Sequence, residues 1–177
     1  MPVNVHVAED EWNYLPADST NDGLMNAHTW RVDMTAPGII GHDALVQGLE
    51  NAVKNHPKTI FIASHLANSC ANLARLGELF DRYPNFYADI SARYAEVSPI
   101  PRYASNFFEK YADRLVFGTD MGADSGMYQV IFRILESADE HFYAFDYFEQ
   151  HWPLYGLALP ATTLKKIYQQ NARKLLK

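Results

Sequence analysis

The chain has little of what marks several classes of protein. Its 177 residues include one cysteine, Cys70, which rules out an internal disulfide and is typical of a reducing compartment. No apolar run approaches the roughly 18 residues of a membrane span. The first residues carry neither the basic nor the apolar region of a signal peptide. We therefore expect a cytoplasmic protein with no membrane partner.

Positive charge is also scarce. Lys and Arg number 15 against 21 Asp and Glu, a net charge of −6 with His neutral, and no basic block is present. Because nucleic-acid binding depends on neutralising phosphates, we expect no nucleic-acid partner. The composition is otherwise globular, with 48% hydrophobic residues, and its length fits a single domain over residues 1–177.

Four short segments are dense in β-branched, aromatic and other apolar residues, which predicts buried strands. They are apolar on both alternating faces, as parallel strands of α/β proteins are. The segments are residues 2–8, 58–65, 85–91 and 114–120.

Helical periodicity fills the intervening segments, with apolar residues recurring at three- and four-residue steps. Five helices are predicted, over residues 43–55, 71–83, 102–113, 127–138 and 164–176. Thr162 or Thr163 is a candidate N-cap of the last one.

The alternation of strands and helices predicts an α/β fold built from parallel βαβ units. A doubly wound sheet and a (β/α) barrel both fit this pattern. The glycine-rich phosphate loops of nucleotide-binding sheets do not follow any of the strands, which favours the barrel. Residues 10–41 form a long irregular stretch, for which a functional lid or subunit contact and an ordinary loop insertion are equally weighted.

Polar residues end three of the predicted strands: His6, His65 and Asp120. Parallel α/β folds place their sites at the carboxyl ends of strands, so these side chains are expected to converge. Imidazole and carboxylate groups are ligands for a divalent metal such as zinc. The alternatives are a structural histidine at a strand end and, for Asp120, an N-cap of the next helix.

Other polar residues are assigned structural or solvated roles in preference to chemistry. Cys70 is expected to be a buried small hydrophobe, and His42 and His56 are expected at the surface. Possible but less favoured pocket residues are Glu9, His28, Asp89 and Arg93, and packing is favoured for His141, His151 and Trp152.

Four segments, taken in order, resemble the amidohydrolase-related proteins that include aminocarboxymuconate-semialdehyde decarboxylase. "PVNVHVAE" (2–9) resembles the fifth strand of that family's barrel, "IFIASHL" (60–66) the sixth, and "VFGTDM" (116–121) the eighth. "NARKLL" (171–176) is similar to the closing helix. The resemblance implies the C-terminal half of a metal-dependent (β/α)₈ TIM barrel, strands five to eight.

By this resemblance, His6 is a metal ligand, Asp120 is a metal ligand or a water-orienting base, and His65 is the catalytic acid or base. The implied cofactor is a divalent metal, zinc or manganese. Two departures stand out. The glycine that the family carries soon after the sixth-strand histidine is replaced here by Leu66-Ala67-Asn68, and the His-x-His pair of the first strand is absent from these residues.

The resemblance thus implies a metal-dependent hydrolase acting on a small molecule. The alternatives are a non-oxidative decarboxylase or hydratase of a carboxylated substrate, and a non-catalytic half-barrel. Because a catalytic zinc normally has three protein ligands, we expect these residues to form an incomplete site by themselves. A longer parent chain with an N-terminal half, or a homo-oligomer, is expected to complete it. Both outer strands are expected to be open edges.

Overall fold

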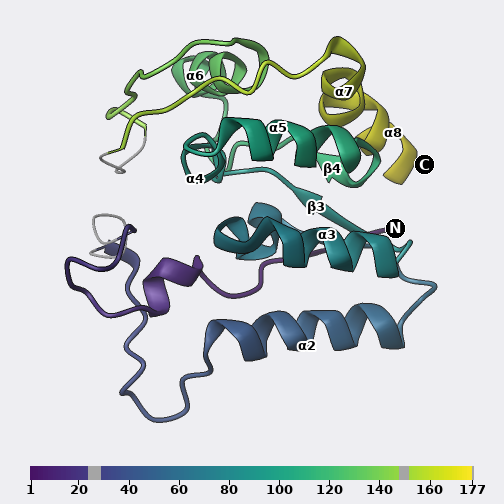
Figure 1. Ribbon diagram of the computed structural model, residues 1–177. Helices are drawn as coiled ribbons and strands as arrows, with labels where there is room; N and C mark the ends of the chain where they lie inside the picture. The colour runs from purple at the N-terminus through teal and green to yellow at the C-terminus, as the bar shows by residue number, and fades with distance from the viewer. Residues whose placement is uncertain (24–28, 148–151, 177) are drawn as a thin grey trace.

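A computed structural model describes residues 1–23, 29–147 and 152–176. Its strands form one parallel sheet in the order β1-β2-β3-β4. Figure 1 shows β3 and β4 of this sheet lying between helices. The strands are β1 (Val3–Val5), β2 (Phe61–Ala63), β3 (Phe86–Asp89) and β4 (Leu115–Val116). A doubly wound sheet reverses its strand order at a switch point, whereas a barrel keeps neighbours sequential. The sequential order therefore confirms the predicted barrel-type α/β fold.

Helices follow the strands as the periodicity predicted. They are α2 (His42–Asn55), α3 (Leu73–Arg82), α4 (Tyr94–Val97), α5 (Pro101–Lys110), α6 (Ser125–Glu136), α7 (Ala161–Lys165) and α8 (Asn171–Leu175), with a π-helical turn (Lys166–Gln170) between the last two. The short α4 was not predicted. Pro160, not a threonine, precedes the first turn of α7, so the predicted threonine cap is wrong.

Local sequence explains where the main helices begin. The Asn72 side chain accepts from Arg75 N and caps α3. Pro101 opens α5, where its missing N–H would have no helical partner in any case. The Asp124 side chain accepts from Met127 N and caps α6. These caps satisfy amide groups that the first turn of a helix leaves without partners.

Each strand is shorter than predicted because the chain turns sharply at its carboxyl end. A non-glycine residue with positive φ follows every strand: Ala8 (58°), His65 (59°), Ala92 (55°) and Asp120 (63°). This left-handed conformation is unfavourable for L-residues and cannot continue a pleated strand. The predicted segments therefore contain each strand together with the first residues of the loop that follows it.

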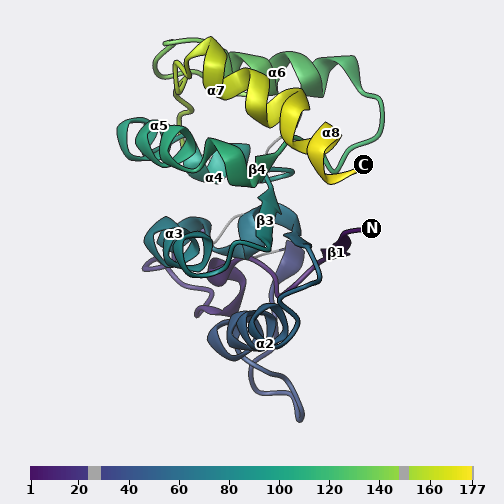
Figure 2. The same cartoon turned by 90° about the vertical axis from the view of Figure 1, so that its right-hand side faces the viewer.

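The two faces of the sheet have different surroundings. The register aligns one row of Val5, Ala63, Ala88 and Leu115, and a second row that includes Asn4 and Ile62. The last three residues of the first row are 0% exposed, whereas the second row runs from an exposed Asn4 through a half-buried Ile62 to a buried Tyr87. In Figure 2 the helices lie below, to the left of and above the strands. The helices thus cover the first row, as they cover the outer face of a barrel.

The outer edge of β4 differs from the prediction. The Val116 carbonyl accepts from the backbone N–H of Ile90, so it points toward the side of β3. Because backbone groups alternate along a strand, those of Leu115 and Phe117 point toward the opposite, outer edge. Asn171 Nδ2 donates to the Leu115 carbonyl at 2.7 Å, and Phe117 N donates to the Ile167 carbonyl at 3.1 Å.

Ile167 lies in the π-helical turn, whose wider spacing frees a carbonyl from the regular helical ladder. The C-terminal helix therefore covers the edge of β4. β4 is the last strand of the sheet, as expected, but its edge is not fully open, because this segment pairs with two of its backbone groups.

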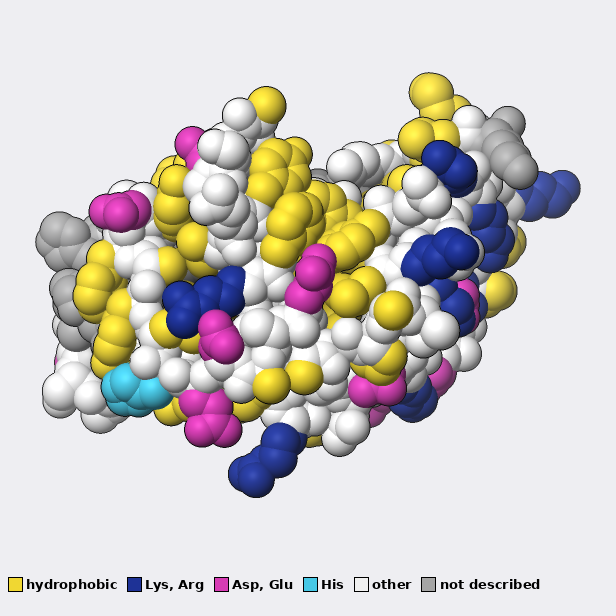
Figure 3. All heavy atoms as spheres, turned by 90° about the horizontal axis from the view of Figure 1, so that it is seen from above, with side chains coloured by type: hydrophobic (Ala, Val, Ile, Leu, Met, Phe, Trp, Pro, Cys, Tyr) yellow, Lys and Arg dark blue, Asp and Glu magenta, His cyan; other side chains and the backbone are white. Residues whose placement is uncertain are grey.

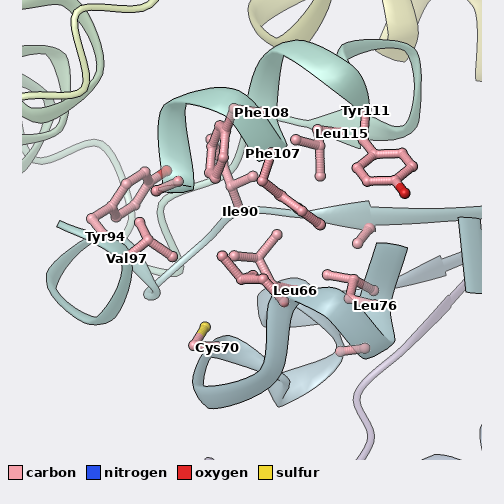
Figure 4. Packing of buried hydrophobic residues seen from close by; sticks show 14 of the residues in the cluster. Leu66, Cys70, Leu76, Ile90, Tyr94, Val97, Phe107, Phe108, Tyr111 and Leu115 are labelled. Carbon is pink, nitrogen blue, oxygen red and sulfur yellow. The ribbon is translucent and has the colours of Figure 1, made fainter. Parts of the chain in front are cut away.

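The main core lies between the sheet and the surrounding helices. Figure 4 shows Leu66 and Ile90 packed among Phe107, Phe108 and Leu115, all buried. Part of the apolar surface remains outside this core. Figure 3 shows hydrophobic side chains gathered in the middle of the face seen from above. Among the exposed apolar residues is Phe132, 38% exposed, whose ring contacts Tyr168. In the part of the chain that the structure describes, no helix has the length and apolarity to cross a membrane.

Candidate active site

A cavity of about 400 Å³ lies at the carboxyl ends of the strands. The chain segments that follow β1, β2, β3 and β4 all contribute to its wall. Its lining includes His6, Glu9, Asp10, Asn13, Trp30, His65, Arg93, Glu96, Asp120, Met127 and Tyr147. The three residues predicted from the strand ends therefore share one pocket.

His65 is held in one orientation by contacts of its inner ring nitrogen. Nδ1 lies 3.0 Å from the Ser91 carbonyl oxygen and 3.0 Å from Ser91 Oγ. A carbonyl oxygen only accepts, so Nδ1 carries the proton in neutral His65 and the lone pair is on Nε2. Nε2 lies 4.0 Å from Asp120 Oδ2. The site thus presents the basic nitrogen of a buried imidazole beside an exposed carboxylate.

His6 and Asp120 lie on either side of this imidazole in the sheet order. The His6 ring is 5.0 Å from the His65 ring, centroid to centroid, in an edge-on arrangement at 73°. The Asp120 side chain is 60% exposed and opens to the pocket. Asp124, not Asp120, caps α6, so the interpretation of Asp120 as a helix cap is wrong. Among the described residues, the Asp120 carboxylate faces His65, the His6 ring packs against the His65 ring, and neither side chain caps a helix.

The segment that carries His65 has an unusual backbone. His65, Leu66, Ala67 and Asn68 all have φ between 48° and 59°. Left-handed conformation costs about 1–2 kcal/mol per L-residue and normally occurs at single positions. Residues 65–68 therefore form a strained left-handed turn, which the surrounding structure must hold in place. This is the turn in which the chain lacks the glycine that the family carries.

Asp89 supplies part of this support. Its Oδ1 accepts from His65 N at 3.0 Å and from Ser91 N at 3.0 Å, and Ser91 Oγ also donates to it. Asp89 is buried and does not belong to the pocket lining. It lies next to the site and has a structural role, since it fixes the backbone of the catalytic candidate.

A buried ion cluster forms one side of the pocket. Arg93 Nε lies 3.1 Å from Asp10 Oδ2, and Arg93 Nη1 lies 3.7 Å from Glu96 Oε1. Burial raises the pKa of Asp10, although Arg93 acts in the opposite direction. Burial opposes the charge of Arg93, but the Asp10 and Glu96 carboxylates outweigh it and raise the pKa of the guanidinium. Asp10 and Glu96 were missed because neither ends a strand nor belongs to a motif.

Two histidines outside the pocket were predicted to lie at the surface, and the structure confirms this for only one of them. His42 is buried, and its Nε2 lies 2.7 Å from the Asn68 carbonyl oxygen, so the expectation of a surface position is wrong. Its place at the first turn of α2 turns the ring toward the segment after β2. His56 is exposed, as expected. His28 and His151 lie outside the described residues.

The donor types fit a divalent metal, but their number is one short of a catalytic site. His6 and Asp120 offer an imidazole and a carboxylate, both zinc ligands. Among the described residues, no group of three or more His, Cys, Asp or Glu is placed to hold a metal. A third ligand, or a rearrangement that recruits His65, is required.

A comparison with protein-family models places the fold and pocket in a known context. The amidohydrolase family model matches residues 2–177, nearly the whole chain, and the chain belongs to the amidohydrolase family. A search of curated proteins and a search of solved structures gave no match. Members of the amidohydrolase superfamily typically use divalent metals.

Proposed function

We propose that the chain is the carboxyl-terminal part of a metal-dependent hydrolase that acts on a small molecule. The observation that carries this proposal is the shared pocket of His6, His65 and Asp120, with His65 Nε2 4.0 Å from Asp120 Oδ2. Family membership supports an enzyme of this kind. The volume of the pocket, about 400 Å³, and its place at the strand ends suit a small-molecule substrate.

His6 and Asp120 would hold the divalent metal, zinc or manganese. The bound ion would lower the pKa of its water toward about 7. His65 would accept a proton through Nε2, while Nδ1 keeps its own proton and donates it in a hydrogen bond to the Ser91 carbonyl. Asp120 would orient the imidazolium that forms, because opposite charges this close attract.

The pocket lining carries more carboxylates than cationic side chains. Among its described lining residues, four carboxylates, Glu9, Asp10, Glu96 and Asp120, face one guanidinium, that of Arg93. Arg93 is already engaged by Asp10, Glu96 and the backbone carbonyl of Ala92. This excess of negative charge suits the proposed divalent cation, whose own charge would offset part of it.

The third metal ligand and the remaining strands would come from a longer parent chain or from a second copy in a homo-oligomer. A reducing, cytoplasmic location remains our prediction from the single cysteine. The length of the natural reading frame tests for a longer parent chain, and the mass of the protein in solution tests for a homo-oligomer.

The test compares metal binding and hydrolysis in matched variants. Calorimetric titration of the completed enzyme, either the longer parent chain or the homo-oligomer, with zinc and with manganese is expected to show binding that His6→Ala and Asp120→Asn weaken at least about tenfold. His65→Gln is expected to retain metal binding and to lose hydrolysis of a panel of amides, esters and lactones. His56→Ala, an exposed histidine outside the pocket, is the control. Zinc affinity equal to wild type in both ligand variants would overturn the proposal.

A further inference from the structure

Asn68 lies at the end of the left-handed turn, is 0% exposed, and has every hydrogen-bonding position of its side chain occupied. Its Nδ2 donates to the Val7 carbonyl at 3.1 Å and to the Ala8 carbonyl at 2.9 Å. Its Oδ1 accepts from Arg93 Nε at 2.9 Å and from Arg93 Nη2 at 2.7 Å. A side-chain amide has two donor hydrogens and two acceptor lone pairs, so none is left over.

These contacts connect the two histidines of the pocket. Val7 and Ala8 directly follow His6, and Asn68 is three residues after His65 on the same strained turn. The amide therefore bridges the loop after β1 and the loop after β2. The His42 ring holds the Asn68 backbone carbonyl from the side of α2.

Arg93 fixes which way the amide faces. Its guanidinium donates twice to Oδ1, so the NH₂ group must turn toward the two carbonyls. The ion pair with Asp10 in turn fixes the guanidinium. The chain Asp10–Arg93–Asn68 thus runs through all three loops, those after β1, β2 and β3.

We propose that Asn68 is a positioning residue that sets the spacing of His6 and His65, acting through the carbonyls of Val7 and Ala8. Asn68 does not line the pocket, so it acts on the reaction only through the two histidines. This inference rests on the proposed function for its catalytic meaning, but the spacing itself is a property of the unliganded protein. Supporting groups behind metal ligands typically change metal affinity about 10- to 100-fold when they are removed.

The chain offers a matched control in Asn85. It is buried, and its Nδ2 donates to the carbonyls of Val53, His56 and Thr59 at 2.9–3.2 Å. It directly precedes β3, at the amino end of the sheet and away from the pocket. Asn85→Asp removes the same kind of donor and adds the same charge, but it does so far from the histidines.

The experiment compares Asn68→Asp with Asn85→Asp in the full chain. Carboxylate replaces amide in both, so donors that faced carbonyls become acceptors and both variants lose stability. The first readout is the proton–proton NOE between the His6 and His65 rings without metal. The second is zinc affinity by calorimetry. We expect Asn68→Asp to lose the NOE and to bind zinc at least about tenfold more weakly, and Asn85→Asp to keep both.

Retention of the ring NOE and of zinc affinity in Asn68→Asp would overturn the inference, as would equal losses in the two variants. If Asn68→Asp does not fold, Arg93→Lys provides the second test. Arg93→Lys keeps a positive charge beside Asp10 but removes the paired hydrogen bonds from the guanidinium to Asn68 Oδ1. A smaller loss of the NOE is expected. An unchanged NOE there would refute the role. Absence of zinc binding in wild type would defeat the proposed function, whereas the NOE would still decide the role of Asn68.

Discussion

Replacing Asp89 tests whether its carboxylate holds the catalytic turn. Asp89→Ala leaves the amide N–H groups of His65 and Ser91 without their acceptor in a buried region. Each buried, unsatisfied donor costs about 1–3 kcal/mol, so the free energy of unfolding is expected to fall by about 2–6 kcal/mol. Domains are stable by only about 5–15 kcal/mol, so the loss is large. Asp89→Asn keeps an acceptor oxygen and is expected to lose less.

Urea denaturation followed by circular dichroism measures these losses. The control is Asp113→Ala, which removes a carboxylate that is 69% exposed and pairs with Lys166 at 2.7 Å. An exposed pair contributes about 0–1 kcal/mol. If Asp89→Ala destabilises the protein no more than Asp113→Ala does, Asp89 does not support the turn and the strain must be balanced elsewhere.

Three further predictions concern other parts of the chain. Asn171→Leu leaves the carbonyls of Ala112 and Leu115 without donors and should lower the free energy of unfolding by about 2–6 kcal/mol in urea; a loss under 1 kcal/mol would show that the helix covers the edge of β4 without this amide. Burial raises the pKa of Asp10, so stability from its protonated form is present below its unfolded pKa of about 3.9 and lost as pH rises through the folded pKa. From pH 4 upward, the free energy of unfolding of Asp10→Asn should therefore rise relative to that of wild type. Urea denaturation at several pH values measures the difference, and a difference that falls with increasing pH contradicts this prediction. Burial also raises the pKa of the Cys70 thiol, so a thiol reagent at pH 8 should label it only after unfolding, and rapid labelling of the native protein would refute its burial.

Sequence alone indicated much of the fold because the signals are local. Runs such as residues 58–65 carry β-branched and aromatic residues that favour strands, and the stripe of Leu73, Leu76 and Leu79 repeats with a helical period. The alternation of these elements predicted a parallel α/β fold and left both a doubly wound sheet and a barrel open, and the sequential strand order is that of a barrel. The positions of His6, His65 and Asp120 followed too, since residues ending parallel strands meet at one edge of a sheet.

The left-handed turn could not be predicted from residue types. Leu66 and Ala67 disfavour positive φ, and the conformation exists because Asp89 and Asn68 hold its two ends through bonds to distant segments. The burial of His42 has the same origin, since its partner is a carbonyl 26 residues away. Long-range contacts of this kind outweigh the local preferences that sequence patterns report.

The sequence by itself determined the order of strands and helices and the polar residues at the strand ends, because periodicity and residue type act within a few residues. Only the tertiary structure decided how these ends are arranged. It buried Asp10 and Glu96 beside Arg93, turned His65 Nε2 toward Asp120, and covered the edge of β4 with the C-terminal helix. Each of these outcomes depends on satisfying buried polar groups across distant segments, a requirement that exists only once the chain is packed.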